Sequence, residues 1–250
     1  MILRKLNEGE GTVSTKYRRR EKSLGTKHNS NELSPFDELA QEYDAWFDGE
    51  GKVVFATEVR ALQEVLPPLP RPWLEVGVGS GRFAQALGIE TGIDPSIKLL
   101  EIARKRGVTA FLSRGEQMPF ADFAFGTVFI IATLCFVSSP VEVLKEAYRI
   151  LVPNGKIVLG LLLRESAWGK LYQQKKKQGH PLYKHAKFHS YDELLIQLTE
   201  GGFSIERVFS TLFHKPGKVE HMELPRSGYD PAAGFTVVVA KRQGDSVRCE

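Results

Sequence analysis

Three glycines at alternate positions constrain this chain more than any other feature of its sequence. Residues 73–83 read WLEVGVGSGRF, so an apolar run ends in a carboxylate and Gly77, Gly79 and Gly81 follow. The pattern predicts a buried strand, a tight turn and the start of a helix. Glycine suits such a turn because it adopts positive φ at little cost and lets a ligand approach the backbone. The helix N-terminus then presents free N–H groups and a partial positive charge.

Apolar runs alternate with helical patterns from residue 73 onward, which predicts a parallel α/β sheet. The N-terminal helical pattern begins at Ser34, with proline at the next position and Asp37 in the first turn. Its aromatic side chains are expected to pack against the sheet, or Tyr43 and Trp46 form a lid over a bound cofactor. Strands are expected at 73–77, 89–93, 108–112, 125–132, 156–163, 203–213 and 234–241.

Length and composition favour one sizeable globular domain of 250 residues. The longest apolar run, 128–137, is too short to span a bilayer, and the first residues lack the apolar core of a signal peptide. Only Cys135 and Cys249 are present, which argues against a disulfide framework or a thiolate metal cluster. We therefore expect a cytoplasmic protein with no membrane span and no bound metal.

The charge is concentrated at the N-terminus. Residues 1–33 hold eight Lys/Arg against four Glu, while the rest of the chain balances at 26 basic and 26 acidic residues. A segment of this composition is expected to be a flexible, solvated extension, so no nucleic-acid partner is expected. The domain then occupies 34–242, with a polar tail at 243–250.

Asp94 is expected at the end of the second strand, beside the glycine turn. There a carboxylate can accept hydrogen bonds from both hydroxyls of a ribose, although capping the helix after Pro95 is an alternative role. NAD-binding proteins carry such an acid as well. Their G-x-G-x-x-G pattern, however, would need glycine at the position of Arg82.

Three further stretches carry a family resemblance. Residues 93–104 (IDPSIKLLEIAR), 115–120 (GEQMPF) and 146–155 (EAYRILVPNG) resemble D-x-S-x-x-(L/M)-L-x-x-A-(R/K), A-E-x-L-P-F and E-x-x-R-(V/I)-L-K-P-G-G. These motifs are typical of methyltransferases related to ubiquinone and menaquinone biosynthesis. With the E-x-G-x-G-x-G loop, the chain resembles class I S-adenosylmethionine (SAM)-dependent methyltransferases of the type 11 group over residues 35–241.

This resemblance implies a Rossmann-like, seven-stranded, mostly parallel sheet with the last strand antiparallel and helices on both faces. It also implies methyl transfer from SAM to a small-molecule acceptor, with S-adenosylhomocysteine (SAH) as the product. The motifs do not select the acceptor. No N-P-P-Y or D-P-P-Y sequence is present, which disfavours DNA and glutamine-amide acceptors. A nicotinamide-dependent oxidoreductase and a non-catalytic SAM-binding protein remain as alternatives.

The resemblance also assigns a set of cofactor-binding residues. In this set the glycines lie against the methionine part of SAM, Asp94 binds the ribose, Tyr43 the carboxylate, and Glu75 orients the loop or the amino group. Some members bind the adenine amine through an Asp where this chain has Arg114, so here the two following residues must supply that contact. The full set is Tyr43, Glu75, Gly77, Gly79, Gly81, Asp94, Pro95, Gly115, Glu116, Ala132 and Thr133.

Residues 164–189 interrupt the alternation of strands and helices. They concentrate aromatic and histidine side chains and hold seven Lys/Arg against one Glu. We expect this cap insertion and the helix at 43–47 to enclose an acceptor of aromatic or anionic character, although a basic surface helix has the same composition. Tyr183 and His189 are the candidate catalytic residues.

Overall fold

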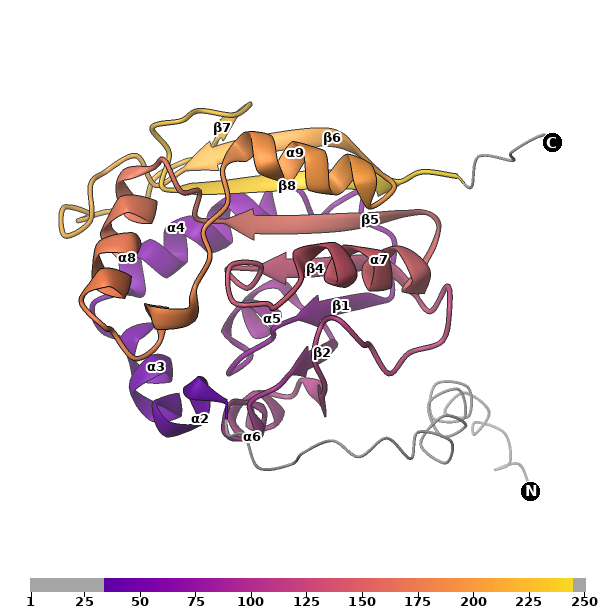
Figure 1. The fold of residues 1–250 in the computed structure, drawn as a ribbon, viewed down its shortest axis with the longest axis horizontal. Coiled ribbons are helices and arrows are strands. Elements are labelled where there is room, and N and C mark those ends of the chain that lie inside the picture. The colour runs from indigo at the N-terminus through magenta and orange to yellow at the C-terminus, as the bar shows by residue number, and fades with distance from the viewer. Residues whose placement is uncertain (1–33, 245–250) are drawn as a thin grey trace, which may run out of the picture.

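The computed structural model describes residues 34–244. One twisted sheet runs through it in the order β3-β2-β1-β4-β5-β8-β6-β7, with helices on both sides (Figure 1). The pairs from β3 to β5 are parallel, and β8 is antiparallel to both of its neighbours. The strands are β1 (Trp73–Val76), β2 (Thr91–Asp94), β3 (Thr109–Leu112), β4 (Phe125–Ile131), β5 (Leu151–Leu161), β6 (Phe203–Thr211), β7 (Arg226–Ser227) and β8 (Phe235–Arg242).

The Rossmann-like fold predicted from the sequence is confirmed, including the antiparallel last strand. The prediction of seven strands is corrected by β7, which pairs with the edge strand β6. Its two residues are too few to give an apolar alternation. β5 begins five residues earlier than predicted, because Asn154 adopts a φ of 63° and the expected turn becomes an irregularity within the strand.

The helices begin where the sequence supplies capping side chains. Ser34, Ser96, Ser139, Ser166 and Ser190 each accept a hydrogen bond from a backbone amide in the first turn of a helix. The helical segments are α2 (Pro35–Glu38), α3 (Ala40–Trp46), α4 (Lys52–Gln63), α5 (Arg82–Leu87), α6 (Ile97–Lys105), α7 (Pro140–Ile150), α8 (Ala167–Lys177), the single turn η1 (Tyr183–His185) and α9 (Tyr191–Glu200).

The sheet separates two hydrophobic cores. Successive residues of β4 point to opposite faces, so Phe129 lies in one core and Val128 in the other. The first core is covered by α4, α5, α6 and α8, and the second by α7 and α9. This arrangement leaves the carboxyl ends of the parallel strands at one edge, next to α2, α3 and the cap (Figure 1). Within residues 34–244, no helix combines the length and apolar character needed to cross a membrane.

Carboxylates fasten the N-terminal helices to this edge. Asp44 on α3 accepts hydrogen bonds from Arg82 Nε at 2.9 Å and Arg106 Nη2 at 2.8 Å. Asp37 on α2 accepts from Ser96 Oγ at 2.7 Å. Burial alone would raise the pKa of Asp44, but the two arginines outweigh burial and lower it to about 2. The ionised carboxylate therefore stabilises the docked position of α3.

We expect Asp44→Asn to lower the free energy of unfolding by about 2 kcal/mol at neutral pH, since the folded-state pKa lies well below its unfolded value. The stabilisation is present above the unfolded pKa of 3.8 and is lost as the pH falls through about 2. The free energies of unfolding of the wild type and of Asp44→Asn should therefore converge as the pH falls. Urea titrations of both proteins at decreasing pH would measure this. Asp48→Asn is the matched control, because Asp48 contacts Arg82 from an exposed position and its loss should change little. Equal effects of the two substitutions would contradict the assignment.

Candidate active site

The glycine loop after β1 makes a sharp turn in which three glycines adopt left-handed backbone angles. Gly77, Gly79 and Gly81 have φ values of 74°, 52° and 81°. A Cβ on Gly77 would lie 2.2 Å from Cγ2 of Thr133, so this position admits no side chain. A Cβ on Gly79 would instead lie 3.6 Å from the ring of Tyr43, on the side of the loop that faces a cavity.

Asp94 ties the end of β2 to this loop. Its carboxylate accepts hydrogen bonds from the backbone amides of Gly79 at 3.0 Å and Ser96 at 2.8 Å. Ser96, not Asp94, is the N-cap of α6. Burial raises the pKa of Asp94 to about 6, against the opposing effect of the two amide donors. The carboxylate is therefore poised to ionise near neutral pH, and its oxygens keep lone pairs that face the cavity.

Most of the predicted cofactor-binding residues line one cavity at the carboxyl edge of the sheet, which we call the glycine-loop cavity. It is the narrower of two adjoining cavities, with a volume of about 100 Å³. The predicted residues in its wall are Tyr43, Gly77, Gly79, Asp94, Pro95, Gly115, Glu116, Ala132 and Thr133.

Glu75 and Gly81 lie behind the loop and do not line this cavity. The side chain of Glu75 is 1% exposed, and its Oε2 has no hydrogen-bond partner among residues 34–244. Burial, and next the charge of Asp94, raise its pKa well above the usual range, so it stays protonated. A Cβ on Gly81 would lie 3.1 Å from Ala103, which explains the glycine by the close packing of α5 and α6. Both residues shape the loop from its protein side.

The far end of the glycine-loop cavity is formed by the segment after β3. Glu116 Oε1 accepts hydrogen bonds from the amides of Ser138 at 2.8 Å and Ser139 at 3.3 Å, so its side chain supports the loop before α7. A Cβ on Gly115 would lie 2.9 Å from Val76, which allows the backbone to run close to β1. Arg114 also lines this end.

A second, larger cavity of about 360 Å³ adjoins the first, and we call it the aromatic cavity. The two cavities share four wall residues: Phe36, Tyr43, Ala132 and Phe136. The remaining wall comes from α3, α4, α5, α8, η1 and the segments beside them: Leu39, Glu42, Trp46, Phe47, Glu58, Phe83, Cys135, Leu162, Tyr172, Lys175, His180, Pro181, Leu182, Tyr183 and Phe188.

Tyr43 lies where the two cavities meet, whereas Trp46 lines only the aromatic cavity. Of the two side chains expected to form a lid over the cofactor, only Tyr43 therefore lines the glycine-loop cavity. Burial, followed by the charge of Asp94, raises the pKa of Tyr43 above its usual range. Its hydroxyl stays protonated and remains a hydrogen-bond donor.

The structure separates the two candidate catalytic residues. Tyr183 lines the aromatic cavity, where its ring centroid lies 4.5 Å from that of Tyr172. His189 does not line that cavity and faces a small hollow at the ends of β4 and β5. Its Nδ1 lies 3.4 Å from the amide nitrogen of Gln197, and its Nε2 has no partner in residues 34–244. Burial lowers the pKa of His189, so the ring is held neutral.

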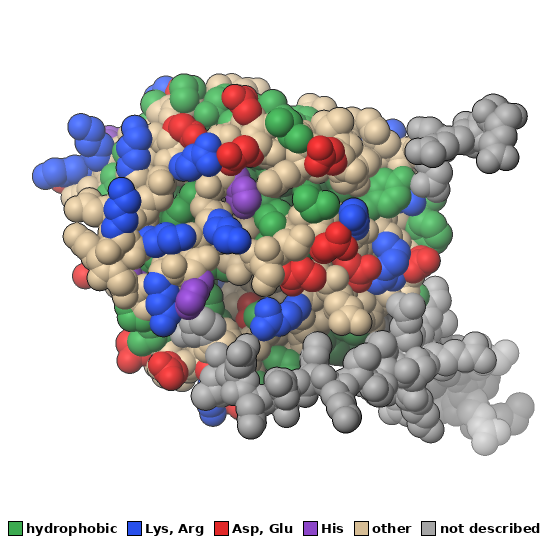
Figure 2. Space-filling view, viewed as in Figure 1, with side chains coloured by type: hydrophobic (Ala, Val, Ile, Leu, Met, Phe, Trp, Pro, Cys, Tyr) green, Lys and Arg blue, Asp and Glu red, His purple; other side chains and the backbone are tan. Residues whose placement is uncertain are grey.

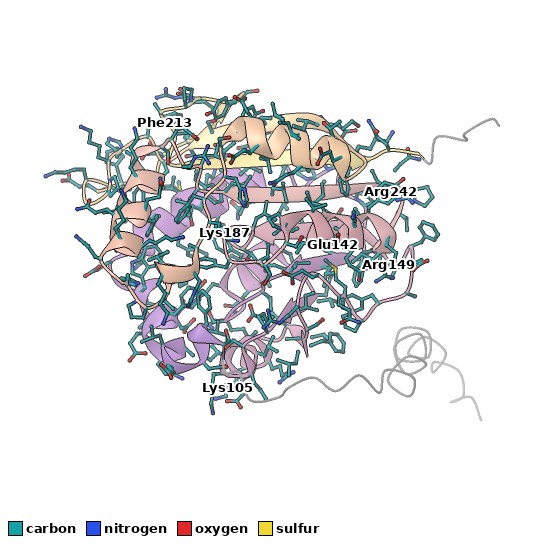
Figure 3. All side chains as sticks on the ribbon, viewed as in Figure 1. Lys105, Glu142, Arg149, Lys187, Phe213 and Arg242 are labelled. Atoms are coloured by element: carbon teal, nitrogen blue, oxygen red, sulfur yellow. The ribbon has the colours of Figure 1, made fainter. Side chains whose placement is uncertain are left out.

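The cap brings positive charge to this end of the molecule. Lys and Arg side chains gather over the end that holds α8 and η1, on the left in Figure 2, while Asp and Glu gather elsewhere on that face. Figure 3 shows Lys187 in the segment that leaves the cap, far from Arg149 and Arg242 at the opposite end. The backbone amide of Lys187 donates to the carbonyl of Cys135 at 2.7 Å, which fastens the cap to the segment after β4.

Sequence reasoning did not identify Glu58 as a site residue. Glu58 is 6% exposed and lines the aromatic cavity from α4. The sequence did hold one signal: Glu58 lies four residues after Val54 and four before Leu62, which share the buried face of α4. A carboxylate at an apolar-face position indicates either a buried partner or a ligand.

Known proteins resemble the chain over most of its length. The methyltransferase-domain family matches residues 74–159. An uncharacterised protein of Methanocaldococcus jannaschii is 37% identical over 210 residues, which cover 84% of this chain and 100% of that protein. A demethylmenaquinone methyltransferase of Thermotoga maritima is 26% identical over 221 residues, which cover 76% of this chain and 94% of that enzyme.

A solved structure from Thermotoga maritima, described as a SAM-dependent methyltransferase and possible histamine N-methyltransferase, is also similar. It has a TM-score of 0.78 and 35% identity, and the alignment covers 84% of this chain and 98% of that one. These similarities include the glycine loop and Asp94 within the matched family segment. The chain therefore belongs to the methyltransferase-domain family and is a SAM-dependent methyltransferase.

Proposed function

We propose that SAM binds in the glycine-loop cavity and that a small-molecule acceptor binds in the aromatic cavity. The observation that carries this proposal is the shared wall, where Tyr43, Ala132 and Phe136 line both cavities. A ligand that extends from the glycine loop toward this wall would present its reacting end to a molecule in the aromatic cavity.

The residues of the glycine-loop cavity suit the chemistry of SAM. The buried Asp94 carboxylate offers acceptor lone pairs to the ribose hydroxyls. The bare backbone at Gly79 leaves space for the methionine part, and the Tyr43 hydroxyl can donate to its carboxylate. Gly115 and Glu116 stand at the end where adenine would lie, with Arg114 beside them.

The aromatic cavity favours a small, largely apolar acceptor. Its volume of about 360 Å³ lies in the range of small-molecule sites, and most of its wall is aromatic or aliphatic. The names of the similar proteins point to different acceptors: the Thermotoga structure is described as a possible histamine N-methyltransferase, and the Thermotoga enzyme as a demethylmenaquinone methyltransferase. A non-catalytic SAM-binding protein would not need a second cavity that shares wall residues with the first.

Methyl transfer is an in-line displacement in which SAM supplies an activated methyl group. The chain contributes alignment: an acceptor held by the rings of the aromatic cavity meets the shared wall from the side opposite the glycine loop. Positioning of this kind is equivalent to effective concentrations on the order of 10⁵ M or more. The apolar wall also excludes water, which would compete as a hydrogen-bonding partner of the nucleophile.

We expect SAH to bind the wild-type protein about tenfold more weakly at about pH 5 than at about pH 7, because only the ionised Asp94 accepts both ribose hydrogen bonds. The affinity should rise as the pH passes through the pKa of about 6. Asp94→Asn should bind more weakly at both pH values and lose the dependence. Isothermal titration calorimetry measures both quantities. A variant that keeps the wild-type affinity and pH profile would refute the role of Asp94.

We expect Gly79→Val to abolish measurable SAH binding, because its side chain would enter the glycine-loop cavity beside Tyr43. Gly107→Val is the matched control: Gly107 also has positive φ, 87°, but a Cβ there meets nothing within 4 Å. Both substitutions carry a similar backbone cost of about 1–2 kcal/mol. The melting temperature should thus fall by a similar amount in both variants. Calorimetry should show SAH binding only in the Gly107→Val control. Normal binding by the Gly79 variant would place the cofactor elsewhere.

A further inference from the structure

The aromatic cavity contains one buried carboxyl group that has no partner among residues 34–244. Glu58 projects from α4, is 6% exposed and lines the cavity wall. Among residues 34–244, no side chain or backbone amide donates a hydrogen bond to its carboxyl group, and no cation forms an ion pair with it. Burial alone raises the pKa of Glu58 to about 8.

Two other buried carboxyl groups are satisfied, and Glu75, which keeps one unpartnered oxygen, lines neither cavity. Asp94 accepts from two backbone amides. Glu223 accepts from the amides of Phe213 at 2.7 Å and His214 at 3.2 Å. A buried, unpartnered carboxyl destabilises the fold, and its retention beside an open cavity indicates a partner that comes from outside the chain.

The rings around Glu58 suit a cationic partner. Tyr172 and Tyr183 lie against each other in the same wall, and the ammonium of Lys175 stands over their rings at 5.5 and 6.0 Å. Aromatic faces attract cations, and Lys175 already uses these two faces in this way. Trp46 adds a further ring to the wall. A carboxyl group among aromatic rings is the usual chemistry of an amine-binding site.

We propose that the methyl acceptor is a small amine with an apolar body, and that Glu58 is the catalytic base that binds its nitrogen and takes up its proton. This inference rests on the proposed function, because it places the acceptor in the aromatic cavity. The apolar body lies against the rings, and the nitrogen lies between Glu58 and the shared wall.

The proton balance explains why a base is needed. With a pKa of about 8, free Glu58 is mostly protonated at neutral pH, and it releases this proton to solvent as the ammonium binds beside it. An ammonium has no lone pair, so its proton then passes to the Glu58 carboxylate, which gives a neutral amine and a carboxylic acid. The nitrogen lone pair then forms the N–C bond as the C–S bond breaks, and the bonding electrons stay on sulfur to give SAH. The product leaves as a methylated ammonium, and the carboxylic acid returns its proton to solvent.

Burial helps this transfer. An ordinary carboxylate is far less basic than an alkylamine, whose pKa is about 10. With its pKa raised to about 8, Glu58 comes much closer to the amine in basicity. The other ionisable groups that line the cavity are Glu42 and Tyr43 on α3, Tyr172 and Lys175 on α8, and His180 and Tyr183 around η1.

The test uses the full-length protein saturated with SAH and three probes of matched shape: phenethylamine, phenethyl alcohol and hydrocinnamate. Binding is measured by calorimetry for the wild type, for Glu58→Gln and for Glu64→Gln. Glu64 follows the same helix and pairs with Arg60 at the surface, away from the cavity, so its variant controls for loss of a carboxylate on this helix. Turnover is followed with SAM by mass detection of N-methylphenethylamine.

We expect phenethylamine to bind best, Glu58→Gln to weaken it by about tenfold or more, and Glu64→Gln to leave it unchanged. Glu58→Gln should lower kcat for this amine by about a hundredfold or more, while its affinity for SAH stays that of the wild type. Unchanged SAH binding also shows that the variant is folded.

Three results would overturn the inference while the proposed function stands: no binding of phenethylamine to the SAH-loaded protein, equal binding of amine and alcohol, or wild-type turnover of the amine by Glu58→Gln. Equal binding of the alcohol would identify a hydroxyl acceptor instead. Failure of the wild-type protein to bind SAH would remove the proposed function itself, and the inference with it.

Discussion

Asp44 lies between the side chains of Arg82 and Arg106, and the position of the N-terminal helices depends on this contact. Arg82 opens the helix that follows the glycine loop, and Arg106 also donates to the carbonyl of Ser80 within that loop at 2.7 Å. One carboxylate therefore connects α3 to the C-terminal end of the loop, at Ser80 and Arg82. Because Tyr43 is the residue before Asp44, the same contact places its ring beside Gly79, in the wall of the glycine-loop cavity.

The shared wall of the two cavities depends on local backbone geometry at the end of β4. Ala132 has a φ of 50°, which is unusual for a residue with a side chain. Its amide donates to the carbonyl of Gly160 at 2.8 Å, so the chain turns while still attached to β5. This turn brings Ala132, with its small methyl group, between the cavities. Under the proposed function, a larger side chain at this point would stand between the cofactor and the acceptor.

The features that could be predicted from the sequence are those that short, continuous segments determine. The glycine turn, the serine caps and the alternation of strands and helices are local signals, and Asp94 follows from the order of β1 and β2. Contacts between distant segments were not visible in the same way. Glu58 enters the cavity because α4 is held against the far edge of the sheet, where Thr57 Oγ1 accepts from the amide of Glu223 at 3.3 Å. His189 turned away from the aromatic cavity for a similar reason, since Gln197 on α9 holds its ring.

The walls of the two cavities come from different parts of the chain. The glycine loop, Asp94 and the segment after β3 lie inside residues 74–159, the part that matches the methyltransferase-domain family. Most of the aromatic cavity comes from segments on either side of that part, α2 to α4 before it and α8 with η1 after it. Under the proposed function, substitutions in α4, α8 and η1 can thus reshape the acceptor site without touching the wall of the glycine-loop cavity. A division of this kind lets the choice of acceptor change through α4, α8 and η1 while the glycine loop and Asp94 stay the same.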